Sequence, residues 1–312
     1  MGRIAFLFTG QGAQYVGMGK DLYDNEPAAK AVFDMGERLR PGTLKQCFES
    51  DQEILTQTQN AQPCLFLMDL ACARVLEAHG LKADIAAGFS LGEIAATAYT
   101  QILTDEEAFK LVTLRGEKMA ACAEENPGGM SAVIKLSAEQ VTKLCKDYED
   151  VFAVNYNCPG QTVVAGKKEQ LAVFGEAVKE AGGRMISLAV SGAFHSPYME
   201  QASDALSAYL TQLVVKAPRI PLIANTTGAP YPMHRNEICE VLAKQASRAV
   251  QWETTLHYLQ ENGVDTFIEV GAGKTLSGLV AKTLSDVKGY HVTDVKTMQS
   301  VVEELAERRL YA

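Results

Sequence analysis

The chain has 312 residues, of which 47% are apolar, and its formal net charge is -9. This length and apolar content allow one large domain, or a large domain that carries a smaller insert. The acidic balance argues against a surface that binds nucleic acid or an anionic membrane. No stretch is long and apolar enough to predict a membrane-spanning helix. We therefore expect a cytoplasmic protein with no nucleic-acid or membrane partner.

Seven cysteines are scattered along the chain. None forms a Cys-x-x-Cys pair, and none is spaced with a histidine as in a zinc finger, so we expect no metal site. An odd, scattered set of cysteines is typical of reduced thiols in a cytosol rather than of a disulfide framework.

The first expected element is a buried strand followed by a glycine loop. Ile4–Phe8 is a short apolar run, which is typical of a strand covered on both faces. Gln11 follows it between Gly10 and Gly12. A dinucleotide fingerprint would need a third glycine where Tyr15 stands, so that interpretation fails. Loops after strands border the active site in open α/β sheets, which makes Gln11 a candidate site residue, although a plain turn stays open.

Residues 20–85 are expected to be mostly helical and rich in surface positions. A short strand then leads into Gly88–Gly92 (Gly-Phe-Ser-Leu-Gly), which fits the G-x-S-x-G pattern of a nucleophile elbow. In an elbow the serine sits on a strained strand-to-helix turn, and the glycines remove Cβ atoms that would clash. Ser90 is therefore a candidate nucleophile, and N–H groups at the helix start can stabilise an oxyanion. A serine in an ordinary turn is the alternative.

An arginine lies on the apolar face of the next expected helix. Thr104–Glu107 forms a capping box, and Arg115 lies four residues from both Leu111 and Met119. A charge on an apolar stripe is costly unless it is paired. Arg115 either forms a buried ion pair, or snorkels to the surface, or points into a pocket where it grips a carboxylate with two hydrogen bonds.

Asn126–Gly129 breaks this helix and predicts a domain boundary. The pattern then indicates strand, helix, strand, strand, helix and strand up to Val190, which is the ferredoxin-like βαββαβ order. We take residues 126–192 as a small subdomain inserted into a main domain of residues 1–125 and 193–312.

Further strands of the main domain are expected over Arg219–Asn225, over Thr266–Val270 and, as an edge strand, over Tyr290–Val295. Gly271–Thr275 looks at first like a phosphate loop. A Walker A motif would need a glycine where Ile268 stands, so we reject a nucleotide site.

His195 is the best candidate base among the five histidines. It alone lies in a short loop bounded by glycine and proline at a domain junction, where pockets tend to form. Because imidazole titrates near neutral pH, His195 is suited to take a proton from Ser90. A solvated loop histidine is the alternative.

Seven stretches together resemble the malonyl-CoA:acyl carrier protein transacylase family, the acyltransferases of fatty-acid and polyketide synthesis. Each match is modest, but all seven occur in the family's order and span essentially the whole chain. The matching stretches are Gly10–Gln14, Gln62–Pro63, Gly88–Glu93, Arg115–Met119, Asn155–Gly166, Ala193–Ser196 and Gln245–Trp252.

The resemblance implies an α/β-hydrolase-like main domain with a mostly parallel sheet and a ferredoxin-like insert. It implies transfer of a malonyl group from malonyl-CoA to the phosphopantetheine thiol of acyl carrier protein through a malonyl-serine ester. No cofactor is implied beyond these two substrates, and we expect a monomer.

The resemblance also assigns roles to individual residues. It implies a Ser90–His195 dyad with no acid, in which the backbone carbonyl of Gln245 orients the histidine. The remaining implied roles are oxyanion binding by the backbone N–H groups of Gln11 and Leu91, and binding of the malonyl carboxylate by Arg115.

Some positions depart from the family pattern. Phe89 replaces the usual histidine beside the nucleophile, so any polar role of that side chain is absent. Cys158 replaces a serine, and Ala249 replaces a proline, which leaves the backbone near Gln245 less constrained. In related polyketide acyltransferases a phenylalanine before the histidine accompanies malonyl and a smaller residue accompanies methylmalonyl, so Phe194 favours malonyl.

Two other functions stay open. A serine hydrolase of the same fold fits Ser90 and His195 equally well but gives Arg115 no role. A non-catalytic docking module for carrier proteins would form no acyl-enzyme.

Overall fold

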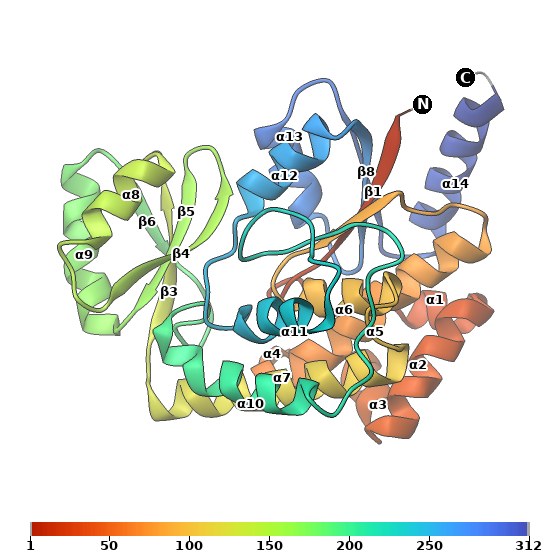
Figure 1. Cartoon of the computed structure of the whole chain (residues 1–312), viewed down its shortest axis with the longest axis horizontal. Coiled ribbons are helices and arrows are strands. Elements are labelled where there is room, and N and C mark those ends of the chain that lie inside the picture. Colours follow the sequence, from red (N-terminus) through yellow and green to blue (C-terminus); the bar gives the residue numbers. More distant parts are fainter. Residues whose placement is uncertain (1, 311–312) are drawn as a thin grey trace.

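The computed structural model describes residues 2–310 and contains two separate sheets with helices packed around them (Figure 1). The larger sheet has the strand order β7-β2-β1-β8-β9, and every neighbouring pair is parallel. The smaller sheet has the order β4-β5-β3-β6 with antiparallel neighbours. Within residues 2–310 no helix has the length and apolarity needed to cross a membrane.

The parallel sheet is buried on both faces, as the apolar run at its centre predicts. Ile4, Phe6 and Phe8 of its central strand face one hydrophobic cluster, and Ala5 and Leu7 face another. Its strands are β1 (Arg3–Phe8), β2 (Ile85–Gly88), β7 (Leu222–Ile223), β8 (Val264–Val270) and β9 (Lys288–Val292).

The expectation of a strand over Arg219–Asn225 is largely wrong, because only Leu222–Ile223 pairs with the sheet. Pro218 and Pro221 both precede Leu222 and have no N–H to donate to a ladder, which confines prolines to edges and strand ends. The edge strand expected near Tyr290–Val295 is present as β9.

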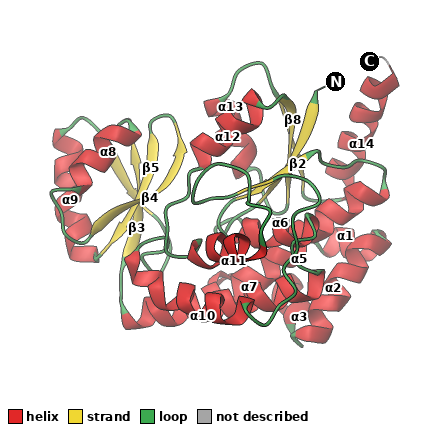
Figure 2. Ribbon diagram, in the orientation of Figure 1, coloured by secondary structure: helices red, strands yellow, loops and turns green. Residues whose placement is uncertain are grey.

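Helices cover both faces of the parallel sheet (Figure 2). Most of them precede or follow a strand of this sheet. Their bounds are α1 (Lys20–Asn25), α2 (Pro27–Leu39), α3 (Thr43–Phe48), α4 (Gln52–Thr56), α5 (Thr58–Ala78), α6 (Leu91–Tyr99), α7 (Asp105–Glu125), α10 (Glu200–Leu210), α11 (Arg235–Lys244), α12 (Trp252–Glu261), α13 (Thr275–Thr283) and α14 (Val295–Leu310).

Residues 20–85 are largely helical as predicted, but the expectation of surface positions is wrong for α5. This helix packs against α2, α6 and α7, and its residues from Ala61 to Ala73 are all buried. A helix that is apolar around its whole circumference lies inside a protein. The one-sided pattern of a surface helix is therefore absent from α5.

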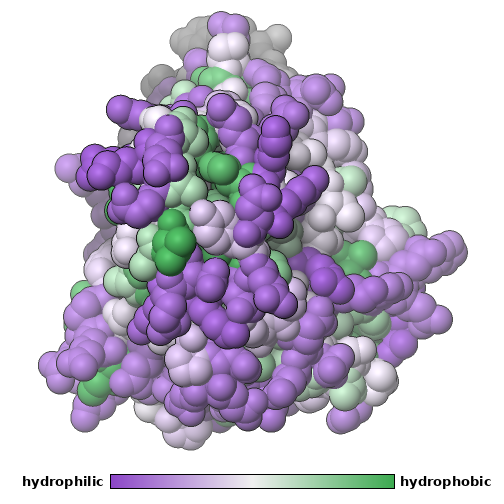
Figure 3. Space-filling view, turned by 90° about the vertical axis from the view of Figure 1, so that its left-hand side faces the viewer, coloured by the Kyte–Doolittle hydropathy of each residue, from purple (hydrophilic) through white to green (hydrophobic). Residues whose placement is uncertain are grey.

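The smaller sheet follows the predicted order of strand, helix, strand, strand, helix and strand. Helices α8 and α9 cover one of its faces, and the other face packs against the main hydrophobic cluster. The side of the molecule that carries these two helices is largely hydrophilic (Figure 3). The bounds are β3 (Gly129–Ile134), α8 (Ala138–Cys145), β4 (Val151–Cys158), β5 (Gln161–Gly166), α9 (Lys168–Glu180) and β6 (Arg184–Ser187).

The turn between β2 and α6 has the geometry of a nucleophile elbow. Ser90 adopts φ 54°, which is strained for a residue with a Cβ atom. A Cβ atom on Gly88 would lie 2.1 Å from the carbonyl carbon of Gly92, and one on Gly92 would lie 2.3 Å from the oxygen of Phe8. The prediction that both glycines are needed for close backbone approach is confirmed.

We predict that Gly88→Ala destabilises the protein by roughly 3 kcal/mol or more, because the added Cβ meets backbone that cannot move aside. Urea unfolding followed by circular dichroism measures the change. Gly278→Ala is the matched control, since its Cβ enters open space within α13 and raises helix propensity by up to about 1 kcal/mol. Equal stability of the two variants would contradict the close approach seen at the elbow.

Candidate active site

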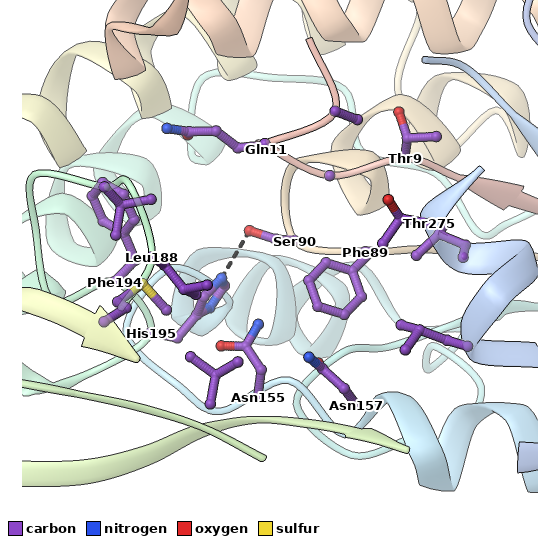
Figure 4. A pocket seen from close by; sticks show the side chains of 18 of the residues that line it. Thr9, Gln11, Phe89, Ser90, Asn155, Asn157, Leu188, Phe194, His195 and Thr275 are labelled. Carbon is purple, nitrogen blue, oxygen red and sulfur yellow. Dashed lines mark hydrogen bonds between the residues drawn. The ribbon is translucent and has the colours of Figure 1, made fainter. Parts of the chain in front are cut away.

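Two parallel strands bring the candidate residues to one edge of the sheet. Phe8 at the end of β1 lies opposite Gly88 at the end of β2. Gln11 and Ser90 follow these strand ends directly, so both lie at the carboxyl edge where ligands bind in open α/β sheets. Figure 4 shows them on the wall of one cavity.

Ser90 and His195 are in direct contact. His195 Nε2 lies 2.8 Å from Ser90 Oγ, as the dashed line in Figure 4 marks. His195 comes from the loop before the 3-10 helix Pro197–Met199 and, like Ser90, has a positive φ, of 60°. The imidazole is only 4% exposed, so it is not the solvated histidine of the alternative interpretation.

Two backbone carbonyls orient the imidazole. Nδ1 lies 3.0 Å from the oxygen of Gln245 and 3.1 Å from the oxygen of Arg248. Carbonyl oxygens only accept hydrogen bonds, so Nδ1 carries the proton and Nε2 is left to accept from the Ser90 hydroxyl. The Arg248 carbonyl is a partner that the sequence did not indicate.

The environment keeps His195 neutral. Burial lowers the pKa of the imidazole to about 4, and the nearby positive charge of Arg115 acts in the same direction. The two carbonyl contacts oppose this shift. A neutral imidazole with a free Nε2 can act as a general base at neutral pH.

Arg115 lies on α7 beside the nucleophile and is 1% exposed, so it does not snorkel to the surface. Its Nη2 donates to Ser90 Oγ over 3.2 Å, and its other hydrogen bonds go to the side-chain oxygens of Gln62 and Gln245. These partners are neutral. Burial lowers the pKa of the guanidinium to about 10, while the charge of Glu93 opposes the shift.

Gln245, at the end of α11, links several parts of the site. Its backbone carbonyl accepts from His195, its Oε1 accepts from Arg115, and its Nε2 donates to the carbonyl of Ser90 over 2.6 Å. The side chain was not predicted to have a role. It links Arg115 to the backbone of Ser90, while the backbone carbonyl of the same residue contacts His195.

Asn225 is a site residue that the sequence analysis missed. Its Oδ1 accepts from the N–H of Ser90 over 2.7 Å, and its Nδ2 donates to the carbonyl of Gly88 over 2.5 Å. Its own N–H donates to the buried Glu93 carboxylate, which also accepts from Tyr231. The sequence placed it at the end of the expected strand Arg219–Asn225, but the pairing of that strand with β2, which brings Asn225 to Ser90, is seen only in the structure.

Glu93 is a buried acid directly behind the elbow. Burial raises the pKa of its carboxyl to about 7, against the lowering effect of the hydrogen bonds from Tyr231 and Asn225. Glu93 accepts from the N–H of Asn225, whose side chain in turn holds the carbonyl of Gly88 and the N–H of Ser90 at the entry to the strained turn.

The cavity at the nucleophile has a volume of about 270 Å³ and a largely apolar wall. Gln11 and Phe194 lie on this wall, whereas Leu91 is buried at the first position of α6. The other lining residues include Phe89, Met119, Met130, Asn155, Asn157, Val163, Leu188, Val190, Leu276 and Leu279. Within residues 2–310 no three His, Cys, Asp or Glu side chains are arranged to hold a metal ion.

Phe89 stands where the resemblance led us to expect a histidine. Its ring packs edge-on against Trp252 with the centroids 5.2 Å apart, and it forms part of the cavity wall. It therefore adds apolar surface beside Ser90.

A serine hydroxyl that a neutral imidazole can deprotonate attacks carbonyl carbons, so the site belongs to an enzyme that moves or hydrolyses acyl groups. The family described as "Acyl transferase domain" matches residues 5–309. The chain belongs to this family and is an acyltransferase.

Individual relatives are similar to this chain over nearly its full length. The malonyl CoA-acyl carrier protein transacylase of Bacillus subtilis (strain 168) is 39% identical over 313 residues, which cover 98% of each chain. The solved structure of the transacylase from Clostridium perfringens matches with a TM-score of 0.94, 34% identity and 99% of each chain. A structure of a type II PKS acyl-carrier protein in complex with its malonyl-transacylase matches with a TM-score of 0.93 and 31% identity, over 97% of this chain and 99% of that one.

We predict that the rate at which Ser90 is acylated by a neutral ester, p-nitrophenyl acetate, stays constant from pH 7 down to about pH 5. It then falls around pH 4, because only the neutral form of His195 accepts a proton and burial lowers its pKa to about 4. Stopped-flow release of p-nitrophenol, followed at a wavelength where its neutral and ionised forms absorb equally, measures the rate, with Ser90→Ala as the background. A half-point near pH 6.5 would contradict the neutral, buried imidazole.

Proposed function

We propose that the chain transfers a malonyl group from malonyl-CoA to the phosphopantetheine thiol of an acyl carrier protein through an ester on Ser90. The product would supply chain extension in fatty-acid or polyketide synthesis. The observation that carries the proposal is the buried guanidinium of Arg115, which lies 3.2 Å from Ser90 Oγ and whose hydrogen-bond partners within residues 2–310 are all neutral. An acyl group that ends in a carboxylate supplies the missing negative charge.

We assign the main body to an α/β-hydrolase-like domain of residues 1–125 and 193–312, and residues 126–192 to a ferredoxin-like subdomain. The parallel sheet with its nucleophile elbow supports the first assignment, and the antiparallel strand order β4-β5-β3-β6 supports the second. The cavity is lined from both units, so the proposed active site lies where they meet.

The first half of the proposed cycle loads the serine. His195 Nε2 takes the Ser90 proton as Oγ attacks the thioester carbonyl, and the tetrahedral intermediate carries a negative oxygen. The backbone N–H groups of Gln11 and Leu91 are the proposed donors to this oxygen, each worth about 3 kcal/mol by analogy with serine proteases. The carbon–sulfur bond then breaks, and coenzyme A leaves as a thiol with the proton from His195.

The second half unloads the serine. His195 takes the proton of the phosphopantetheine thiol as its sulfur attacks the malonyl ester carbonyl. The carbon–oxygen bond breaks, and the proton returns to Ser90 Oγ. The apolar cavity wall supports transfer over hydrolysis, because it leaves few groups that would hold an attacking water.

Two residues are proposed to select the acyl group. Arg115 would bind the malonyl carboxylate, so an acyl group without a carboxylate would leave the buried cation without a charged partner. Phe194, 6% exposed at the cavity wall, is proposed to limit the space beside the acyl carbon and so to favour malonyl over methylmalonyl.

Other expectations stay predictions. They are a reaction without a cofactor, a monomeric state and a cytoplasmic location. Seven free cysteines, six of them buried, support a reducing compartment.

Intact-mass spectrometry tests the proposed function. We predict that the wild-type chain mixed with malonyl-CoA gains the mass of one malonyl group and loses it on addition of phosphopantetheinylated carrier protein, while Ser90→Ala gains none. Labelled malonyl appearing as free malonate instead of on the carrier protein would identify a serine hydrolase. If the wild type shows no mass shift, the proposed acyl-enzyme is contradicted and the chain is a non-catalytic docking module instead.

We predict that Arg115→Ala lowers kcat/KM for malonyl-CoA by at least about 100-fold and raises relative activity on acetyl-CoA. The reason is loss of the buried positive charge beside Ser90 that would meet the acyl carboxylate. Arg115→Lys is the matched control, because it keeps the charge but loses the forked geometry, and an intermediate loss is expected. Malonyl preference that survives in Arg115→Ala would exclude the carboxylate role.

A further inference from the structure

The loop that carries Gln11 is fastened to helix α5 at two points. Thr9, the first residue after β1, donates from Oγ1 to Oδ1 of Asp69 over 2.6 Å. The Nε2 of Gln11 donates to Oγ1 of Thr58, at the start of the same helix, over 3.1 Å. Figure 4 shows Thr9 and Gln11 together on one wall of the cavity. Both anchors therefore act on the segment that is proposed to bind the oxyanion.

The other side of this loop packs directly on the nucleophile elbow. A Cβ atom on Gly10 would lie 2.8 Å from the backbone oxygen of Phe89 and 2.9 Å from a carbon of its ring. The N–H of Phe89 donates to the carbonyl of Phe8 over 2.9 Å, so the elbow is also joined to the end of β1. The loop is thus held between the elbow and α5, and loss of an anchor on α5 would let its backbone shift relative to Ser90.

Asp69 is a costly residue for the middle of a buried helix. Its side chain is completely buried, Oδ1 accepts from the neutral hydroxyl of Thr9, and Oδ2 has no hydrogen-bond partner within residues 2–310. Burial raises the pKa of this carboxyl well above its usual value, and the nearby charge of Glu269 acts in the same direction. An apolar side chain of similar volume would cost less folding free energy here. Stability does not account for the carboxyl, so its hydrogen bond to the loop is the contact to explain.

Gly271 provides the space for this hydrogen bond. It follows β8 with φ 132°, and a Cβ atom on it would lie 1.9 Å from Oδ1 of Asp69 and 2.6 Å from Oγ1 of Thr9. The ends of β1 and β8 are neighbours, since Phe8 lies opposite Val270. The pair therefore lies at the carboxyl edge of the sheet, where the site is built.

We propose that Asp69 and Thr9 are positioning residues for the oxyanion hole, because their hydrogen bond fixes the loop so that the N–H of Gln11 points at the oxygen of the tetrahedral intermediate. This inference rests on the proposed function, which assigns that N–H to the oxyanion. The negative oxygen develops only as the transition state is reached. A displaced N–H therefore lowers the rate of acylation and leaves the binding of the thioester unchanged.

A set of substitutions separates positioning from stability. Thr9→Val and Asp69→Leu each remove one partner with little change in shape, and the double variant replaces both partners by apolar groups. Asp69→Asn keeps a side-chain oxygen that accepts from Thr9. Thr97→Val is the matched control, because its buried hydroxyl donates to a carbonyl of its own helix, α6.

The first readout is single-turnover acylation of Ser90 by malonyl-CoA. In the double variant we expect the rate at saturating malonyl-CoA to fall about tenfold to 100-fold, with the half-saturating concentration unchanged. Its melting temperature should equal or exceed that of the wild type, because a buried carboxyl has been replaced. Asp69→Asn and Thr97→Val should keep the wild-type rate. A wild-type rate in the double variant, or Asp69→Asn as slow as Asp69→Leu, would overturn the proposal.

The second readout reports on the oxyanion hole itself. An isotope-labelled acetyl group is placed on Ser90 from p-nitrophenyl acetate, and infrared spectroscopy records the stretching frequency of its ester carbonyl. A carbonyl with weaker hydrogen bonds absorbs at a higher frequency. The band should therefore shift upward in Thr9→Val and stay in place in Thr97→Val. An unshifted band in Thr9→Val contradicts the positioning role.

Failure of this inference and failure of the proposed function give different results. A wild type that forms no malonyl ester contradicts the function, and the rate comparison is then made with p-nitrophenyl acetate. A malonyl ester that forms equally fast in the wild type and the double variant leaves the function intact and overturns the anchor.

Discussion

The hydrogen bond between Ser90 Oγ and His195 Nε2 is the contact on which the rest of the site depends. It joins residues 105 positions apart, and both adopt positive φ values that an isolated chain would avoid. Asn225 holds the backbone that leads into the serine, through the carbonyl of Gly88 and the N–H of Ser90, and the carbonyls of Gln245 and Arg248 hold the imidazole. The strain at both residues is thus maintained by hydrogen bonds from segments that meet only in the folded chain.

Burial of charge sets the chemistry around this contact. Removal from water lowers the pKa of His195 and of Arg115 and raises that of Glu93. The base therefore stays neutral beside a cation whose own hydrogen bonds go to neutral partners. Arg115 contributes to the lowered pKa of His195, so the group proposed to select the acyl chain also keeps the base ready to accept a proton.

Local patterns were enough to predict some parts of this arrangement. The elbow at Ser90 is encoded by two glycines four positions apart, and the spacing from Leu111 and Met119 placed Arg115 on the apolar face of its helix but left its burial open. The βαββαβ order follows from short alternating segments. Asn225 could not be identified in this way, because its role arises only when β7 pairs with β2. The exposure of α5 was mispredicted for a related reason: helices from other parts of the chain cover all of its sides.

Phe89 stands where the resemblance led us to expect a histidine, and its contacts are separate from those that position Ser90 and His195. The Phe89 ring packs on Trp252, and the backbone N–H of this residue donates to Phe8 within the sheet. None of the contacts that orient Ser90 or His195 involves the side chain at position 89. The hydrogen bonds that position the serine and the imidazole are therefore independent of that side chain. Phe89 instead makes the cavity wall more apolar, which raises the importance of the few polar groups that a ligand can meet there.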